Sequence, residues 1–295
     1  MRQLPDISIR QLEYLVAVAD HPTWAVAAES VGVSASALSQ GLAELERRLG
    51  VDLFERDGRR RSIRPSVGPV LDHARQVLAL TGDLAGWAAR IRTAASGSVR
   101  VGMIDVAAVI HFPAALAAFR REHPDVELVL TVAPSAALLE QLRNGQLDLV
   151  VCVRPTSLPP GLVDEVLLVE PLVVYAPDGV VIGHPANWGP WVLFPEDSHT
   201  RREVEAGLTA MGATVRITAE SHQPDVLGQM VRLGLGWTVL PVVQDPGGVT
   251  VGPRVAVRQL VLVRRSGAVV DPAADALATS LRSRSTSDVR HTKGI

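Results

Sequence analysis

Residues 23–50 read Thr23-Trp-Ala-Val-Ala-Ala-Glu-Ser-Val-Gly-Val-Ser34-Ala-Ser-Ala-Leu-Ser-Gln-Gly-Leu-Ala-Glu-Leu-Glu-Arg-Arg-Leu-Gly50. Thr23 is a typical N-cap residue, and Gly32 is placed to turn the chain where the following helix ends. Ser34 or Ser36 then begins another helix, which ends at Gly50. Two short helices joined by a tight turn predict a helix-turn-helix. Apolar residues at helical spacing form the expected buried sides: Trp24, Ala27, Ala28 and Val31, then Leu38, Leu42, Leu45 and Leu49.

One more helix is expected before this pair. Ser8 and Gln11 have the spacing of a capping box, in which each side chain can bond the backbone N–H of the other residue. This helix ends at His21-Pro22, because proline cannot continue it. Its apolar face consists of Ile9, Leu12, Leu15, Val16 and Ala19.

The segment that follows the helix pair is basic. Between Arg47 and Arg64 there are seven arginines and three acidic residues, a local net charge of +4, whereas the whole chain has a net charge of −2. Such asymmetry is typical of a DNA-binding head on a nearly neutral body. An exposed basic loop without a partner is the alternative, and charge alone does not decide between them.

Several of these residues occur together in the order and spacing of a known signature. They are Ala27-Ala28-Glu-Ser-Val-Gly-Val33-Ser34, Ala37-Leu38-Ser39, Leu45-Glu46, Leu49-Gly50 and Leu53-Phe54-Glu-Arg56. In these residues and their spacing, the N-terminal region resembles the LysR-type transcriptional regulators. The resemblance implies an all-α winged helix-turn-helix DNA-binding domain over residues 1–66.

The chain departs from the family pattern at three places. Ala35-Ser36 stands where Gln-Pro is common, and Gln40-Gly41 stands where Arg-Gln is common. After the wing, Arg64-Pro65-Ser66-Val67-Gly68 stands where Leu-Thr-x-Ala-Gly is common. Glycine costs about 1 kcal/mol relative to alanine inside a helix, so Gly41 weakens its helix. These departures bear on base preference and on the angle between wing and linker.

Residues 67–94 are expected to form one long linker helix. Its apolar residues alternate at spacings of three and four, as in a coiled-coil seam. The seam either packs on its own domain or joins two subunits, and the family resemblance implies a homo-oligomer through residues 70–91. The seam residues are Val70, His73, Val77, Leu80, Leu84, Trp87 and Ile91.

Beyond the hinge Ala95-Ser-Gly-Ser98, apolar strands alternate with amphipathic helices, and over residues 99–153 this alternation predicts a parallel sheet. The expected helices are 107–122, 136–144, 201–211, 225–233 and 272–282. The expected strands are 99–104, 126–132, 148–153, 191–194, 215–219, 237–240 and 259–264, with extended chain at 162–175. Residues 283–295 are predicted to be a polar, disordered tail.

This region resembles the effector domain of the same family, a two-lobed α/β fold like a periplasmic binding protein. The matching residues are Val101-Gly102, Phe119, Pro124, Gly145-Gln-Leu-Asp148 and Gly234-Leu-Gly-Trp-Thr-Val-Leu-Pro241. The implied domain spans residues 97–282. Its lobe I covers about 97–160 and 258–282, and its lobe II covers about 161–257.

Candidate DNA contacts lie on the second helix of the pair and on the wing. Hydroxyl and amide side chains in its first turns suit the reading of base edges in the major groove, although Ser34 and Ser36 can equally be caps. Wing arginines suit phosphates or a narrow minor groove. The candidates are Thr23, Ser34, Ser36, Ser39, Gln40, Arg56, Arg59, Arg60 and Arg61.

An effector is expected between the two lobes, where helix N-termini offer free N–H groups to an anion. A small organic acid is the predicted ligand, and each candidate residue can instead be an ordinary cap or loop residue. The candidates are Val106, Ala107, Ser135, Arg154, Pro195, Asp197, Ser198, Thr200 and Gln223.

Composition limits the other possibilities. The single cysteine, Cys152, lies in an apolar run, where a buried hydrophobe is favoured over a reactive thiol, and it allows neither an intrachain disulfide nor a cysteine zinc site. No segment has the pattern of an export signal or a membrane span, so a cytoplasmic protein is expected.

Catalysis is not expected, nor is a cofactor. Aspartate, serine and histidine come together only at Asp197-Ser198-His199, where adjacent side chains point in different directions, and the sole lysine is Lys293 near the end of the chain. The function predicted is therefore effector-responsive, sequence-specific binding to double-stranded DNA. The alternative is a small-molecule binding protein whose helical head contacts only other proteins.

Overall fold

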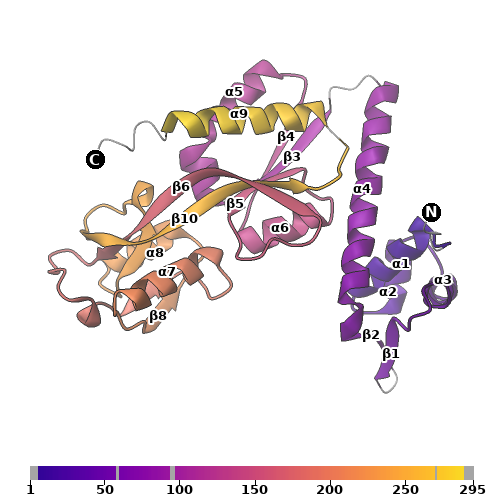
Figure 1. Cartoon of the computed structure of the whole chain (residues 1–295), viewed down its shortest axis with the longest axis horizontal. Helices are drawn as coiled ribbons and strands as arrows, with labels where there is room; N and C mark the ends of the chain where they lie inside the picture. The colour runs from indigo at the N-terminus through magenta and orange to yellow at the C-terminus, as the bar shows by residue number, and fades with distance from the viewer. Residues whose placement is uncertain (1–5, 58–59, 94–96, 270, 289–295) are drawn as a thin grey trace. The chain divides into compact units, whose positions relative to one another are not determined.

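The computed structural model describes residues 6–57, 60–93, 97–269 and 271–288 (Figure 1). The chain divides into two compact units. The first comes chiefly from residues 1–92 and carries three short helices, a β-hairpin and one long helix. The second comes from most of the remaining chain and is an α/β body built on a six-stranded sheet.

The head of the first unit begins its helices at the caps that the sequence predicts. The capping box of Ser8 and Gln11 is present, and Thr23 Oγ1 accepts a hydrogen bond from the N–H of Val26. Ser34 Oγ accepts from the N–H of Ala37, so Ser34, and not Ser36, is the N-cap of the third helix. The elements are α1 (Ile9–Asp20), α2 (Trp24–Ser30), α3 (Ala35–Leu49), β1 (Phe54–Asp57) and β2 (Arg60–Ile63).

Signature residues hold this head together. Leu38, Leu42 and Leu45 are fully buried, and the rings of Trp24 and Phe54 meet edge to face with centroids 5.0 Å apart. Glu46 Oε1 accepts hydrogen bonds from the N–H groups of Leu53 and Phe54 at 2.9 and 3.2 Å. The end of α3 is thereby fastened to the start of the wing hairpin β1–β2.

The linker helix α4 (Gly68–Thr93) follows a short 3-10 turn, η1 (Pro65–Val67). Val67 of η1 is buried in the core of the head. The first half of α4 packs on the same core through buried Ala74 and half-buried Val70 and Val77. Over this first half of the helix, the seam therefore packs on its own domain, which is one of the two alternatives that the sequence leaves open. Further along, the side chains of Leu84 and Trp87 are 53% and 39% exposed. The side chain of Ile91 lies outside the described residues.

The sheet of the second unit has the strand order β4-β3-β5-β10-β6-β9. Its first three strands are parallel, whereas the pairs β5–β10, β10–β6 and β6–β9 are antiparallel. The parallel sheet expected from residues 99–153 is therefore confirmed in β3, β4 and β5. The antiparallel pairing of β6, β9 and β10 was not predicted, because alternating elements do not fix the direction of strands that pair without a crossover helix. The strands are β3 (Ser98–Met103), β4 (Glu127–Val132), β5 (Leu149–Val153), β6 (Leu162–Ala176), β9 (Thr238–Pro241) and β10 (Thr250–Arg265).

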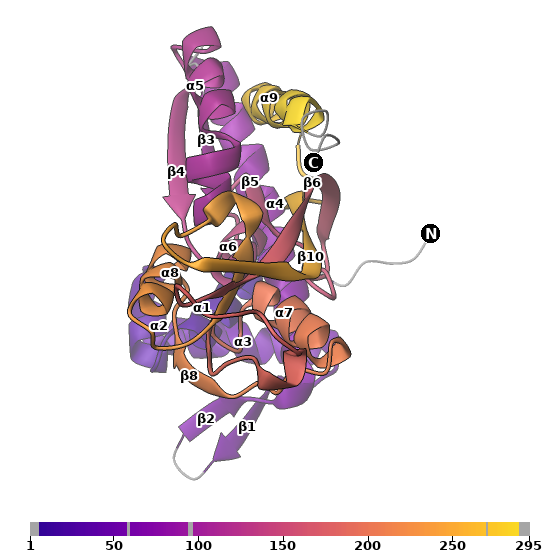
Figure 2. The ribbon, with the colours of Figure 1, turned by 90° about the vertical axis from the view of Figure 1, so that its left-hand side faces the viewer.

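The long strands β6 and β10 pair along most of their length and connect two lobes (Figure 2). Lobe I carries β3, β4 and β5, and lobe II carries β9 and a second small parallel sheet, β7 (Trp191–Leu193) with β8 (Ile217–Glu220). The helices of lobe I are α5 (Pro113–Glu122), α6 (Ser135–Arg143) and α9 (Pro272–Asp288). Those of lobe II are α7 (His199–Ala210) and α8 (Pro224–Arg232), with short 3-10 turns η3 (Pro185–Asn187) and η4 (Val242–Gln244).

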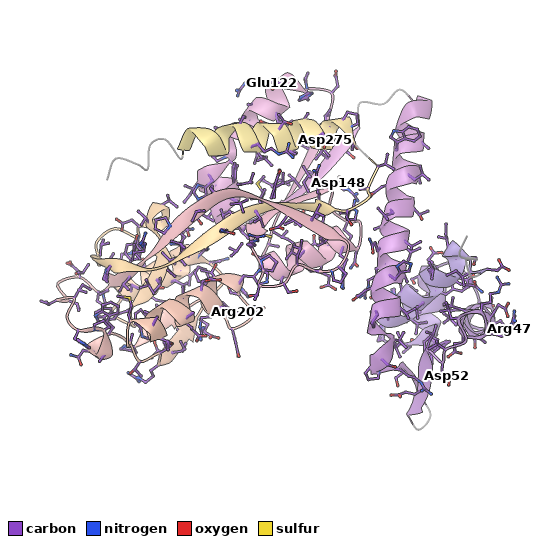
Figure 3. All side chains as sticks on the ribbon, in the orientation of Figure 1. Arg47, Asp52, Glu122, Asp148, Arg202 and Asp275 are labelled. Carbon is purple, nitrogen blue, oxygen red and sulfur yellow. The ribbon has the colours of Figure 1, made fainter. Side chains whose placement is uncertain are left out.

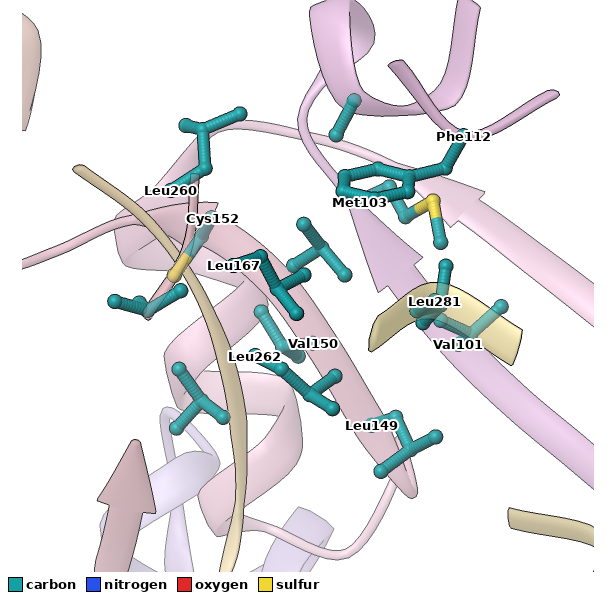
Figure 4. Close-up of a cluster of buried hydrophobic side chains, with 14 of the residues drawn as sticks. Val101, Met103, Phe112, Leu149, Val150, Cys152, Leu167, Leu260, Leu262 and Leu281 are labelled. Atoms are coloured by element: carbon teal, nitrogen blue, oxygen red, sulfur yellow. The ribbon is translucent and has the colours of Figure 1, made fainter. Parts of the chain in front are cut away.

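Each lobe has its own apolar core. In lobe I, Met103, Phe112 and Leu281 pack around the buried strand β5 (Figure 4). Cys152 is completely buried there, and burial raises the pKa of its thiol, with the charge of Asp164 adding to the shift. The residue is thus a small hydrophobe of the core, as the sequence favours.

Two of the expected helices differ from those observed. The helix expected over 107–122 is a π-helical turn, η2 (Ala107–His111), followed by α5, and Phe112 donates to the carbonyl of Ala107 across that turn. Pro113 explains the break, because a proline lacks an N–H and disfavours a helical conformation in the preceding residue. At the other end, α9 continues to Asp288, so residues 283–288 of the expected disordered tail are helical. Residues 289–295 lie outside the described residues.

Candidate functional site

The structure places the candidate DNA contacts of α3 on two kinds of position. Ser34 acts as a cap, whereas Ser36 and Gln40 are exposed and Ser39 is half-buried. Thr23 caps α2. In the wing hairpin, Arg56 pairs with Arg61 across the two strands, and Arg60 pairs with Asp57. Arg59 and the side chains of Arg56, Arg60 and Arg61 lie outside the described residues.

Acidic neighbours compensate part of the positive charge of the basic segment. Arg47 and Arg48 both bond to Glu44, and these hydrogen bonds lower the pKa of Glu44 to about 2. Arg64 lies 3.5 Å from Asp52. Figure 3 shows Arg47 on α3 and Asp52 in the loop after it. The four remaining arginines of the segment, Arg56 and Arg59–Arg61, belong to the wing.

Gly41 has a packing reason for departing from the family pattern. A Cβ atom built at this position would lie 2.7 Å from two ring carbons of Tyr14 on α1. The absent side chain therefore lets α3 approach α1 closely. Gln11, also on α1, donates to the carbonyl of Gly41 at 3.4 Å.

A cavity of about 250 Å³ lies between the two lobes of the second unit. Three helix starts border it: Ser135 of α6 in lobe I, and Ser198 before α7 and Gln223 before α8 in lobe II. Helix N-termini present unpaired N–H groups and a partial positive charge. The cavity is therefore electropositive at several fixed points of its backbone.

The hydroxyl groups at these helix starts are used differently. Ser135 Oγ accepts a hydrogen bond from the N–H of Val153 at 3.3 Å, so this serine ties α6 to β5. Ser198 occupies the N-cap position of α7 but makes no side-chain cap bond. Thr200 Oγ1 accepts from Arg258 at 2.9 Å.

A buried charge network joins the lobes behind this cavity. Arg258 of β10 is 4% exposed, and its Nε donates to Glu170 Oε2 of β6 at 2.7 Å. Glu170 also accepts from Nε2 of His111 in lobe I. Burial alone raises the pKa of Glu170, but the bond from His111 and the charge of Arg258 outweigh it, and the pKa lies below its ordinary value.

Arg258 retains one unsatisfied donor. Its Nε is bonded to Glu170 and its Nη1 to Thr200, whereas Nη2 is buried and has no hydrogen-bond partner among the described residues. A buried guanidinium N–H without an acceptor is costly and rare. Arg258 lines the cavity, so an acceptor on a bound ligand is the natural partner.

Asp105 contributes the opposite charge. It follows β3, lines the cavity, and accepts a hydrogen bond from the N–H of Val106 at 2.7 Å. Burial raises its pKa, and the nearby carboxylates of Asp225 and Glu170 add to the shift, while the bond from Val106 and the charge of Arg258 oppose it.

The cavity gathers only some of the predicted effector residues. Ser135, Asp197, Ser198, Thr200 and Gln223 line it. Val106 and Ala107 do not, because both are buried in the core of lobe I, and Pro195 is not among the lining residues. Arg154 also lies elsewhere: its Nε is 2.9 Å from Asp164 and its Nη1 donates to Gln259.

Sequence reasoning missed Asp105, His199, His222 and Arg258, all of which line the cavity. A signal was available for Arg258, which is a charged residue inside the apolar strand Val255–Val263. Glu170 interrupts the apolar run of β6 in the same way. Two opposite charges in two apolar strands indicate a buried ion pair.

A winged helix-turn-helix head followed by a two-lobed domain with a cavity defines a ligand-responsive, DNA-binding regulator of transcription. Comparison with known families agrees on both parts. Residues 9–67 match the bacterial regulatory helix-turn-helix proteins of the lysR family, and residues 92–286 match the LysR substrate binding domain. The chain belongs to the LysR family of transcriptional regulators. It is therefore a DNA-binding regulator with an effector-binding domain, and not an enzyme.

Individual relatives share this organisation. An HTH-type transcriptional regulator of Shigella flexneri, YfeR, is 30% identical, over 92% of each chain. A probable hydrogen peroxide-inducible genes activator of Streptomyces viridosporus is 31% identical, over 79% of this chain and 77% of its own. Full-length OxyR from Pseudomonas aeruginosa has a similar structure, with a TM-score of 0.65, 25% identity, and coverage of 94% of this chain and 95% of that one.

The structure of CbnR in complex with its target DNA shares the fold, with a TM-score of 0.59 at 20% identity, over 94% of this chain and all of the other. Family membership favours DNA binding by the head over the alternative of protein contacts alone. Across the described part of the chain, no helix combines the length and apolar character that crossing a bilayer requires.

Proposed function

We propose that this regulator responds to a small acidic metabolite bound in the cavity between its lobes. The observation that carries the proposal is that three helix starts and Arg258, whose buried Nη2 lacks a hydrogen-bond partner among the described residues, all border one cavity. Helix N-termini and a buried guanidinium both favour a negative group. The cavity volume of about 250 Å³ suits a small metabolite, being below the usual range for drug-sized ligands.

In this proposal the head reads DNA through α3 and grips it through the wing. The exposed Ser36 and Gln40, with Ser39, face the major groove and contact base edges. The wing arginines contact phosphates on either side of the groove. Thr23 and Ser34 are occupied as caps, so their part is to position the helices and their N–H groups.

The proposed active form is a homo-oligomer joined through α4. Leu84 and Trp87 expose apolar surface on the half of α4 that does not pack on the head. A second copy of the helix would cover that surface, and paired heads would then contact two half-sites.

Effector binding acts by shifting a population of lobe arrangements. The strands β6 and β10 connect the lobes, and the network of His111, Glu170, Arg258 and Thr200 spans the same junction. A ligand that contacts both lobes stabilises the arrangement in which both sets of contacts are made. The oligomer transmits the difference to the heads.

The proposal does not include a thiol-based response to peroxide, despite the names of some relatives. Cys152 is the single cysteine of the chain and is completely buried. Burial raises the pKa of its thiol, whereas oxidation requires an accessible thiolate.

Its test measures DNA affinity of the full chain with and without small carboxylic acids. Genomic fragments enriched by the purified protein supply the operator. We expect at least one acid to change operator affinity about 5- to 150-fold. Ser198→Ala should reduce that response, because it removes a hydroxyl that lines the cavity and makes no cap bond.

Ser157→Ala is the matched control, an exposed serine that does not line the cavity. It should leave the response intact. The proposal fails if no acid alters DNA affinity while cationic or wholly apolar compounds do.

A further inference from the structure

The charges around the cavity do not match a simple anion. Arg258 is its one arginine, and the positive charge of that residue is already balanced by Glu170, at 2.7 Å and 4% exposed. What Arg258 offers is a hydrogen-bond donor, Nη2, more than an excess of charge. A ligand carrying only carboxylates therefore gains little net charge attraction from Arg258.

Asp105 supplies a second requirement. Its carboxylate lines the same cavity, and the one hydrogen bond it makes among the described residues is from the N–H of Val106 to Oδ1. Burial raises the pKa of Asp105, and the negative charges of Asp225 and Glu170 add to that shift against the bond from Val106 and the charge of Arg258. A cation placed beside Asp105 would relieve this cost, because an opposite charge favours the ionised carboxylate.

We infer that the effector is a small zwitterion, an α-amino acid, whose carboxylate binds Arg258 and the helix starts and whose ammonium group binds Asp105. This inference rests on the proposed function and specifies its ligand. The carboxylate supplies the acceptor that Nη2 lacks, and the ammonium supplies the charge that Asp105 lacks.

Size and wall chemistry restrict the side chain of this amino acid. A cavity of about 250 Å³ has the volume of on the order of eight water molecules, at about 30 Å³ each. Valine has a comparable number of non-hydrogen atoms. The cavity walls between the polar groups are apolar, formed by Ile104, Val132, Val153 and Phe194. An aliphatic side chain fits these walls, because it brings no polar group that would need a hydrogen-bond partner there.

Calorimetric titration of the full chain with matched probes tests the inference. The twenty standard L-amino acids are first screened by thermal shift. For the tightest binder, the acid lacking the amino group and the amine lacking the carboxylate are then titrated. For L-valine these probes are 3-methylbutanoate and 2-methylpropylamine. We expect the amino acid to bind at least tenfold more tightly than either, since the acid leaves Asp105 without a cation and the amine leaves Nη2 of Arg258 without an acceptor.

Two variants assign the contacts. Asp105→Asn retains an oxygen for the N–H of Val106 but removes the charge, so it should abolish the preference for the amino acid over the corresponding acid. Asp178→Asn is the matched control, because Asp178 makes the same bond to the next N–H but is exposed and outside the cavity. It should keep the preference. Arg258→Lys should weaken every carboxylate probe at least tenfold, and circular dichroism checks its folding.

The outcomes separate the inference from the proposed function. Equal affinity for the amino acid and the corresponding acid, or an unchanged preference in Asp105→Asn, overturns the zwitterion and leaves an acidic effector standing. If neither amino acids nor acids bind, both are overturned. Should Arg258→Lys fail to fold, Asp105→Asn and the three probes still decide the result.

Discussion

Glycine at position 41 weakens α3 by its flexibility and permits a contact that alanine would obstruct. Alanine would gain about 1 kcal/mol of helix propensity. Its Cβ, however, would lie 2.7 Å from the ring of Tyr14, and that ring is also 5.6 Å from the guanidinium of Arg10. Overpacking of this kind costs about 1–3 kcal/mol, so the loss exceeds or equals the gain.

We therefore expect Gly41→Ala to destabilise the head by up to about 2 kcal/mol. Gly82→Ala is the matched control, since Gly82 is also helical and an added Cβ there meets nothing within 4 Å. It should stabilise α4 by about 0.5–1 kcal/mol. Amide hydrogen exchange over residues 35–49 and 68–88 measures both effects. Greater protection of α3 in Gly41→Ala would contradict the packing argument.

Single residues were predictable where their partners are close in sequence. Ser8, Thr23 and Ser34 cap helices by bonding N–H groups three residues away, and such bonds depend on local sequence alone. Arg258 depends on Glu170 and Thr200, which are 88 and 58 residues away. No local pattern specifies which buried charges meet, so the chemistry of the cavity emerged only from the fold.

Among the elements, we propose that α3 contacts base edges and that the wing contacts phosphates. Gln40→Ala should weaken operator binding by about 1–3 kcal/mol and relax selectivity at one base pair, because it removes a base-edge contact. Arg60→Ala should weaken operator and unrelated DNA about equally and reduce the salt slope by about one. Affinities for both DNAs across a salt series distinguish these outcomes.

The matched control for the arginine is Arg120→Ala, which removes the same charge from an exposed position on α5. It should alter neither affinity nor slope. If Gln40→Ala leaves operator affinity and selectivity intact, α3 is not the reading helix.

At this scale the sequence predicts where elements lie better than how they join. The apolar pattern identifies β5 as a continuous apolar run, β4 as a mostly apolar segment and β3 by apolar residues at every second position. It does not reveal that β10 extends back to Thr250, because polar and exposed residues interrupt the apolar ones over residues 250–259. It also does not show that β6 and β10 pair with each other. That pairing connects residues about 90 apart, and it creates the junction on which the cavity depends.

For the whole molecule, α4 packs on the head through its first half, and we propose that its second half joins two subunits. Its first half completes the core of the head through Ala74, Val70 and Val77. Its second half presents Leu84 and Trp87, which are 53% and 39% exposed. A regular seam over the full helix suggested one interface, whereas burial restricts the surface available to another subunit to the part beyond Val77.

Charge placed on that surface should separate the subunits. We expect Leu84→Arg combined with Trp87→Arg to dissociate the oligomer at micromolar concentration and to weaken operator binding at least about 100-fold, because two half-sites then bind independently. As a control, Ala85→Arg adds one arginine at the next residue, about 100° around the helix from Leu84, and should have little effect. Sedimentation measures the oligomer, and circular dichroism verifies that the effector domain remains folded. An unchanged sedimentation coefficient in the double variant would show that the principal interface lies outside α4, and a loss of operator binding would then need another cause.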